Sequence, residues 1–173
     1  MKKNGWSCRL VAVSWVCLFV LGACAQPVVS NGDKGVEAAA AALASEVAYA
    51  RGAGRISLRI AEGWTYEIQE EEADDGTFSI IFWSDEDPAG RMRVSYHETF
   101  GVCGTGLEQK EIQIGGYPAW QGTYDQKEVW DYIHIPDEDG DYVVYNENDS
   151  AWWKVHESEV MEMLKTLRIG TDA

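Results

Sequence analysis

The chain has 173 residues, of which 14 are basic and 29 acidic, so its formal net charge is −15 at pH 7. Nucleic acids and anionic lipid headgroups are bound through clusters of Lys and Arg, and the sequence has neither a basic stripe nor a basic helix, which argues against both as partners. With 46% hydrophobic residues, the chain is long enough and apolar enough to bury a sizeable core.

The first 23 residues have the order of a secretory signal peptide. Lys2, Lys3 and Arg9 form a basic flank, and an uncharged, mostly apolar stretch runs from Leu10 to Gly22. This stretch is shorter than the roughly 20 residues that a helix needs to cross a bilayer core, so a permanent membrane span is the weaker interpretation. Removal of the leader takes away three basic residues and no acidic one, which leaves a net charge of −18.

The leader ends in Leu21-Gly22-Ala23-Cys24, which resembles the lipobox of bacterial lipoproteins. The resemblance implies cleavage before Cys24 and acylation of that cysteine, for example with palmitate. Two or more acyl chains hold a domain at a membrane that one chain would hold only loosely. We therefore expect a lipid-anchored protein on the extracytoplasmic face of the cell membrane, or at the outer membrane if the cell has two. The alternative is an ordinary signal peptide cut after Ala23 or Ala25.

Residues 24–35 are polar, contain Gly and Pro, and are interpreted as a tether. Residues 36–54 follow as an alanine-rich segment. Alanine has the best intrinsic helix propensity, but the segment offers few large apolar side chains, so we interpret it as a marginal helix or a spacer that ends near Gly52 and Gly54. Residues 55–170 then form a single globular domain.

From Ile56 onward the hydrophobic pattern has the period of two that strands require. Ile56, Leu58 and Ile60 share one face of a first strand, and a turn at Glu62-Gly63 leads into a second. Turn-forming residues separate the further predicted strands, which are Thr77–Trp83, Met92–His97, Lys110–Ile114, Ala119–Tyr124, Val129–Ile135, Tyr142–Asn146 and Ala151–His156.

The chain closes with an amphipathic helix in this interpretation. Ser158 is the expected N-cap, and an apolar stripe follows at helical spacing, formed by Val160, Met163, Leu164 and Leu167. The sequence therefore predicts an α+β fold, in which an antiparallel sheet of hairpins is covered by a C-terminal helix.

Three short segments resemble parts of known exported domains. A turn ending in Glu62-Gly63-Trp64 and a closing helix ending in Thr166-Leu167-Arg168-Ile169 resemble PsbP-like domains, and Phe100–Leu107 is similar to a segment of uncharacterised small lipoproteins of Gram-positive bacteria. Ala61 departs from the proline that commonly precedes Glu-Gly-Trp, and the several helices of the PsbP fold are not evident. The resemblance implies an α+β sandwich and no agreed chemistry, so no catalytic residue is carried over.

Cys103 lies in the Gly-rich segment Phe100–Leu107, where a thiol can stand beside free backbone N–H groups, as cysteine nucleophiles require. His97 just before the segment is a candidate general base, and His134 and His156 are others. This pattern indicates an alternative function, a small thiol-dependent hydrolase. The excess of negative charge disfavours a thiolate, so we prefer a buried, packed thiol.

Asp137, Asp139 and Asp141 have the spacing of the opening of a calcium loop. The match then ends, because Tyr142 stands where that loop needs its glycine and Asn148 where it needs its bidentate glutamate. We interpret the segment as a hairpin turn and predict no cofactor, with calcium binding as the alternative.

Trp130 and Trp152 are the candidate binding aromatics. Trp152 and Trp153 are adjacent, and adjacent residues of a strand point to opposite faces. Either a helix covers the second face, which we favour, or an exposed aromatic patch marks a binding site. We predict a non-enzymatic binding or interaction module whose ligand is an unknown envelope protein or a glycan.

Overall fold

The described part of the chain consists mostly of β-strands. The computed structural model describes residues 42–71 and 76–173, which belong to a unit that extends from Glu37 to Ala173. Within these residues there is one α-helix, α1 (Ser150–Lys165), and a short 3₁₀ helix, η1 (Gly170–Asp172). The strands are β1 (Leu43–Arg51), β2 (Gly54–Ala61), β3 (Trp64–Glu70), β4 (Phe78–Ser84), β5 (Met92–His97), β6 (Leu107–Ile114), β7 (Tyr117–Tyr124), β8 (Tyr132–Asp137), β9 (Gly140–Asn146) and β10 (Arg168–Ile169). Cys24, the lipobox and the predicted tether lie outside the described residues.

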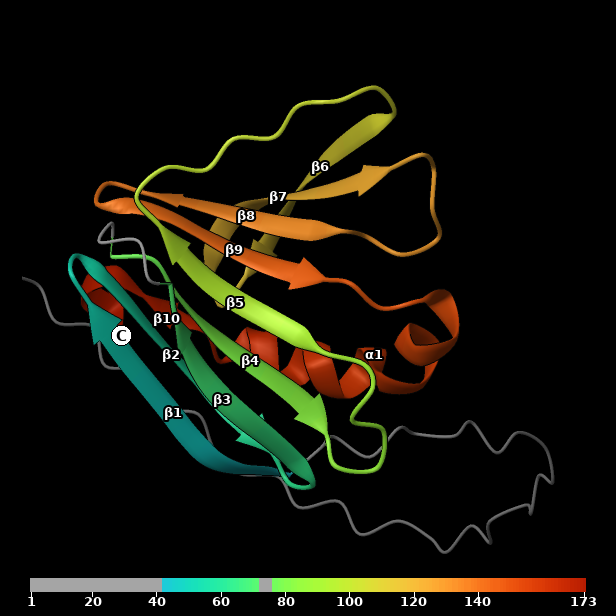
Figure 1. Cartoon of the computed structure of the whole chain (residues 1–173), viewed down its shortest axis with the longest axis horizontal. Coiled ribbons are helices and arrows are strands. Elements are labelled where there is room, and N and C mark those ends of the chain that lie inside the picture. The colour runs from blue at the N-terminus through green and yellow to red at the C-terminus, as the bar shows by residue number, and fades with distance from the viewer. Residues whose placement is uncertain (1–41, 72–75) are drawn as a thin grey trace, which may run out of the picture. The chain divides into compact units, whose positions relative to one another are not determined.

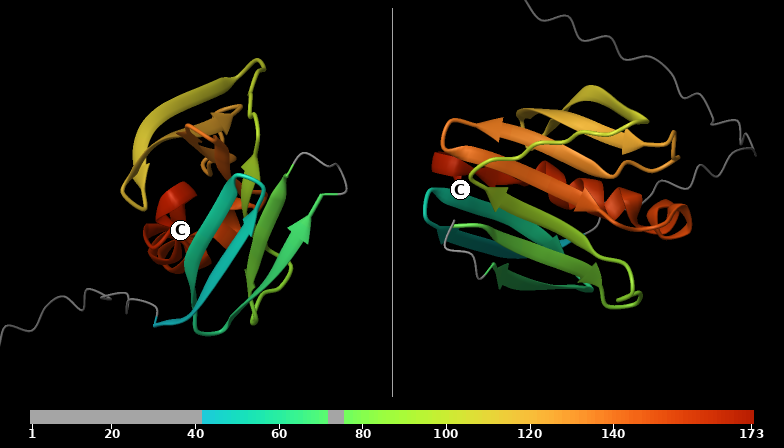
Figure 2. Two further views of the ribbon diagram at one scale, coloured as in Figure 1. Left: turned by 90° about the vertical axis from the view of Figure 1, so that its left-hand side faces the viewer. Right: turned by 45° about the horizontal axis from the view of Figure 1, so that its top comes forward.

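The strands form two antiparallel sheets. The larger has the order β3-β4-β5-β9-β8-β7-β6, and the smaller has the order β1-β2-β10. Figure 1 shows these orders, and Figure 2 shows the large sheet curving around α1, which lies on its inner side. The predicted α+β class, with an antiparallel sheet covered by a C-terminal helix, is confirmed.

The core lies between the large sheet, β2 and α1. Alternate residues of four central strands point into it, as the period of two predicts. They are at most 2% exposed and comprise Phe78, Ile80, Phe82, Met92, Val94, Tyr96, Ile133, Ile135, Tyr142 and Val144. Val160, Met163 and Leu164 of α1 are fully buried against them, which confirms this part of the predicted apolar stripe. Leu167, its last predicted member, is also buried but follows the end of the helix.

The helix begins earlier than predicted. Residues Ala151–His156 are its first turns rather than a strand, and the N-cap is Asp149 rather than Ser158. The Asp149 carboxylate accepts hydrogen bonds from the backbone N–H groups of Ala151 and Trp152, both at 2.9 Å, which satisfies two donors that a helix start leaves free. The two adjacent tryptophans suggest a strand, but tertiary packing outweighs their β-propensity.

The prediction of a helix or spacer in the alanine-rich segment is wrong for its described part. Leu43–Arg51 forms β1, which pairs with β2 from Leu43↔Ala61 to Arg51↔Gly54. Val47 is buried, and the Tyr49 ring meets the Phe78 ring edge-to-face at 5.0 Å. Pairing and packing thus outweigh the helix propensity of alanine, which is a weak preference per residue.

The remaining predicted strands are confirmed, with differences at their ends. β5 has the predicted bounds, and β4, β6, β7 and β9 begin or end within about three residues of the prediction. Val129–Asp131 lies outside β8, because the Asp131 carboxylate accepts from the backbone N–H of Tyr124 at 2.8 Å and thereby shapes the loop before the strand.

Candidate functional site

One end of the β6–β7 hairpin is held by the C-terminal segment. Gly115 in the turn has a φ of +60°, and a Cβ there would lie 2.4 Å from the Leu167 carbonyl oxygen. Arg168 Nη1 donates to the Gly115 carbonyl oxygen at 3.3 Å, and the Tyr117 hydroxyl donates to Asp172 at 3.1 Å. The turn end of the hairpin is therefore packed closely against the last residues of the chain.

The inner face of this hairpin changes from apolar to polar along its length. At the turn end it consists of Ile112, Ile114, Tyr117 and Ala119, which belong to the core or pack against it. At the other end the same face carries two cross-strand pairs, Glu108 with Thr123 and Lys110 with Gln121. We call these four residues the inner polar strip.

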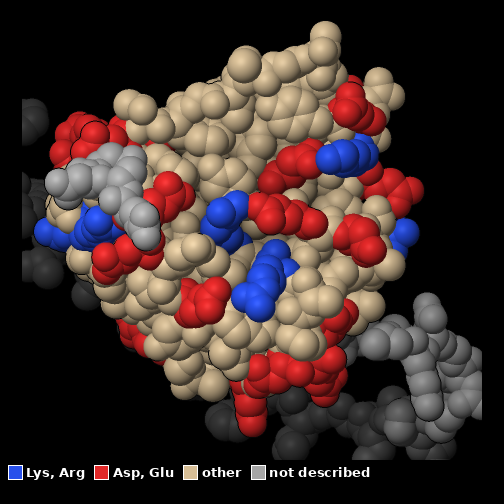
Figure 3. All heavy atoms as spheres, viewed as in Figure 1, with Lys and Arg blue, Asp and Glu red and all other residues tan. Residues whose placement is uncertain are grey.

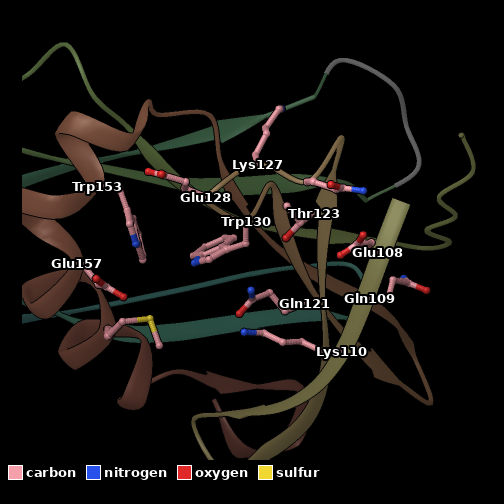
Figure 4. A pocket seen from close by; sticks show the side chains of 12 residues that line it. Glu108, Gln109, Lys110, Gln121, Thr123, Lys127, Glu128, Trp130, Trp153 and Glu157 are labelled. Carbon is pink, nitrogen blue, oxygen red and sulfur yellow. The ribbon is translucent and has the colours of Figure 1, made fainter. Parts of the chain in front are cut away.

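A groove of about 740 Å³ lies between the inner polar strip and α1. Figure 4 shows it from close by, with β6 on one side and α1 on the other. Trp153 and Glu157 project from α1, and Trp130 projects from the loop between β7 and β8. The groove thus combines residues that lie more than 40 positions apart in the sequence.

The polar groups of the groove are available to a ligand. Within residues 42–71 and 76–173, no hydrogen bond or ion pair engages the side chains of the inner polar strip or of Glu157. At the rim of the groove, by contrast, Lys127 already has a partner. Its Nζ lies 2.7 Å from Asp131 Oδ1, and this hydrogen bond raises the pKa of Lys127. Two carboxylates, an ammonium, an amide and a hydroxyl therefore face the groove without a partner from the described chain.

Trp130 and Trp153 form the apolar part of the groove. Their rings meet edge-to-face with centroids 5.2 Å apart, a favourable arrangement for aromatic pairs. Their exposed fractions are only 7% and 6%. They therefore offer edges rather than broad faces, and the exposed aromatic patch considered as an alternative is not found at Trp130.

Trp152 is also a core residue and not a binding aromatic. It is 8% exposed, and its ring lies 4.5 Å from that of His156 and 6.1 Å from that of Trp64. A Cβ at Gly90 would come within 2.1 Å of its indole nitrogen, so the loop backbone closes over the ring. The covering helix that the sequence analysis favoured is α1 itself, on which Trp152 lies.

The loop 98–106 crosses the outer face of the sheet and is held there by Phe100. The centroid of the Phe100 ring lies 5.0 Å from that of His134 and 5.7 Å from that of Tyr132. The backbone N–H of Phe100 donates a hydrogen bond to the Asp141 carboxylate at 2.7 Å. Cys103, three residues further on, is exposed, so the preferred expectation of a buried thiol is wrong.

The candidate pair of Cys103 and a histidine is not assembled. Among the residues that the structure describes, no hydrogen bond joins the Cys103 thiol to a histidine. His97 Nε2 lies 3.2 Å from the Tyr145 hydroxyl, and His134 Nε2 lies 2.6 Å from Asp141 Oδ1. The geometry thus offers no support for the thiol-dependent hydrolase.

The acidic segment is the turn of the β8–β9 hairpin, as the preferred interpretation predicts. Asp137 pairs with Gly140, which leaves Glu138 and Asp139 as the two turn residues. Asp141 points to His134 and to the backbone of the loop, not to the other two aspartates of the candidate calcium set. In the described part of the chain, no group of three His, Cys, Asp or Glu residues is placed to hold a metal ion.

A second cavity, of about 650 Å³, lies on the outer side of the sheet below the loop 98–106. Phe100, Tyr132 and Tyr145 line it, together with polar residues. Asn146 Nδ2 is buried there without a hydrogen-bond partner, but most of the other polar side chains have partners. Asp131 binds Lys127 and the Tyr124 backbone, and Asp149 caps α1. The groove beside α1 is the stronger candidate site, because more of its polar side chains are without a partner among the described residues.

Comparisons with protein-family models, with curated proteins and with solved structures find no match to this chain. The resemblance to PsbP-like domains stays a prediction. No helix within the described residues has the length and apolar character needed to span a membrane.

The inner polar strip was not identified from the sequence, although one signal was present. Lys110 shares a strand face with Ile112 and Ile114, so a charged side chain stands on a face that is otherwise apolar. Trp153 was considered only as the neighbour of Trp152 on a predicted strand, and Glu157, just beyond the end of that strand, gave no signal. Recognition of the groove required the position of α1.

Proposed function

We propose that this protein is a membrane-anchored extracytoplasmic lipoprotein that acts as a non-enzymatic binding module, with the groove beside α1 as its ligand site. The observation that carries the proposal is the inner polar strip, where the face that forms the core elsewhere carries unpaired polar groups. Residues that break the packing pattern of their element without a structural partner are typical of functional sites.

The groove favours a polar ligand with both hydrogen-bond donors and acceptors. The amide of Gln121 and the hydroxyl of Thr123 supply donors, while Glu157 and the Gln121 carbonyl supply acceptors. Its volume of about 740 Å³ suits a segment of a few sugar or amino-acid residues. A glycan strand or a peptide segment of an envelope protein fits this chemistry.

The site is tested with Gln121→Ala, which removes an amide from the inner polar strip. A thermal-shift screen with peptidoglycan fragments, oligosaccharides and peptides first identifies the ligand, since a bound ligand raises the melting temperature. We expect Gln121→Ala to weaken binding about 3- to 10-fold in titration calorimetry, the effect of one lost hydrogen bond.

The matched control is Gln113→Ala, which removes the same amide from the other face of β6. It should leave the affinity within about twofold of the unchanged protein, the scatter expected for a residue that contacts no ligand. Equal effects of the two substitutions, or no effect of Gln121→Ala, would show that the ligand binds elsewhere.

The anchor is tested separately with Cys24→Ala. The unchanged chain should incorporate radiolabelled palmitate in growing bacteria and sediment with membranes, because acyl chains hold the mature protein there. Cys24→Ala should abolish the label, whereas Cys103→Ser, the control, should keep it. Label that persists in Cys24→Ala would contradict a lipid anchor at this residue.

A further inference from the structure

The edges of the two sheets are protected to different degrees. An edge strand exposes unpaired backbone groups, and proteins commonly block them with bulges, very short strands, prolines or charged side chains. β1 has a register shift between Leu43 and Ser45, β10 is two residues long, and the charged residues of β3, Glu67 and Glu70, are both acidic. Each of these three edges therefore carries a feature that opposes pairing.

In the described part of the chain, the β6 edge is protected by charged side chains alone. It has eight residues, pairs with β7 in unbroken register from Leu107↔Tyr124 to Ile114↔Tyr117, and contains no proline. Residues 108–111 are exposed, and their charges are of both signs. The edge is long, regular and open to a further strand.

The charge pattern of β6 is complementary to itself in one register. In an antiparallel pair about a twofold axis, opposite residues lie on the same face, so a symmetric register is centred on a residue that faces its own copy. Centres at Glu108, Lys110 or Glu111 would set like charges against each other. A centre at Gln109 sets Glu108 of each copy opposite Lys110 of the other.

We infer that the partner of β6 is a second copy of this chain, paired edge to edge with Gln109 on the twofold axis. The Glu108 and Lys110 side chains, which have no partner within the described residues, then form two reciprocal ion pairs. These pairs select the register against the repulsion between two acidic chains. The two grooves open on the same side of the joined sheet.

Disulfide cross-linking of the full-length chain in membranes tests this register. In a Cys103→Ser background, Gln109→Cys places two cysteines opposite each other, and mild oxidation should yield a linked dimer. Gln113→Cys, on the same face of β6, is the matched control. In the proposed register the two copies of residue 113 would lie about eight positions apart along the strands, roughly 26 Å. Gln113→Cys should therefore yield at least about tenfold less linked dimer than Gln109→Cys. The background without an added cysteine reports any contribution of the other native cysteines.

Charge variants test the ion pairs. Added to Gln109→Cys, Lys110→Glu should reduce the linked dimer about tenfold, and the exchange of both charges, Glu108→Lys with Lys110→Glu, should restore it. Circular dichroism melting should show that every variant folds. The absence of a Gln109 cross-link, equal cross-linking at residue 113, or no effect of Lys110→Glu would overturn the dimer. The ligand site is tested by Gln121→Ala, so the two proposals fail independently.

Discussion

Gly122 allows the Tyr132 side chain to lie across β7 and to contact β6, the strand at one side of the groove. The two residues are register partners, and a Cβ at Gly122 would come within 2.1 Å of the Tyr132 ring. The ring therefore passes over the glycine, and its hydroxyl accepts a hydrogen bond from Gln109 Nε2 at 2.7 Å. Burial raises the pKa of Tyr132, so the neutral phenol is the form favoured in this contact. The hydrogen bond between Gln109 and Tyr132 therefore connects the open end of β6 to β8.

Replacement of Gly122 by alanine should destabilise the domain. The added methyl group would overlap the Tyr132 ring and force it from its place, and such overpacking costs about 1–3 kcal/mol of unfolding free energy. Urea denaturation measures the change. Gly101→Ala is the control, because an added Cβ there meets nothing within 4 Å. Equal losses in the two variants would show that the contact with Tyr132 is not the cause.

At the scale of elements, the sequence predicts those strands and helices whose conformation follows from their own hydrophobic pattern. Met92–His97 forms β5 as predicted, because its apolar residues Met92, Val94 and Tyr96 alternate with polar ones and share the face that lies in the core. Leu43–Arg51 and Ala151–His156 were assigned wrongly for a common reason. The first is a strand because β2 lies beside it, and the second is helical because it continues into a stripe that packs on the sheet. Neither neighbour is visible in the local sequence.

Mutation can test whether Asp149, the observed N-cap of α1, or Ser158, the predicted one, stabilises the start of the helix. Asp149→Ala removes the acceptor of two backbone N–H groups and should lower the unfolding free energy by about 1 kcal/mol. Ser158→Ala should change it by no more than about 0.5 kcal/mol, because Ser158 is an exposed residue in the helix interior. A larger loss from Ser158→Ala than from Asp149→Ala in urea denaturation would contradict the observed helix start.

At the scale of the whole molecule, the acidic character predicted from composition is visible on the surface. On the face seen in Figure 3, the few basic side chains lie next to acidic ones, in keeping with ion pairs such as Arg91 with Glu67 at 3.5 Å. Exposed pairs of this kind contribute little stability, about 0–1 kcal/mol each. The groove has a different origin: the inner polar strip of the β6–β7 hairpin lies apart from α1. The composition of the chain does not predict this arrangement.

The candidate site could be predicted only in part for the same reason. Trp130 was selected from the sequence and does line the groove, although as a mostly buried ring. Gln121, Thr123 and Glu157 are ordinary polar residues in any local pattern. They line a common groove because the curvature of the sheet leaves space beside α1 at the open end of the hairpin.

The most direct test of the ligand site is to map a bound ligand by nuclear magnetic resonance. The ¹⁵N-labelled protein is titrated with the peptidoglycan fragment, oligosaccharide or peptide that the thermal-shift screen selects. The account predicts that chemical-shift changes concentrate at the backbone amides of Gln121 and Thr123 and at the indole N–H groups of Trp130 and Trp153. Changes confined to the outer cavity around Phe100 and Tyr145 would contradict the groove as the binding site.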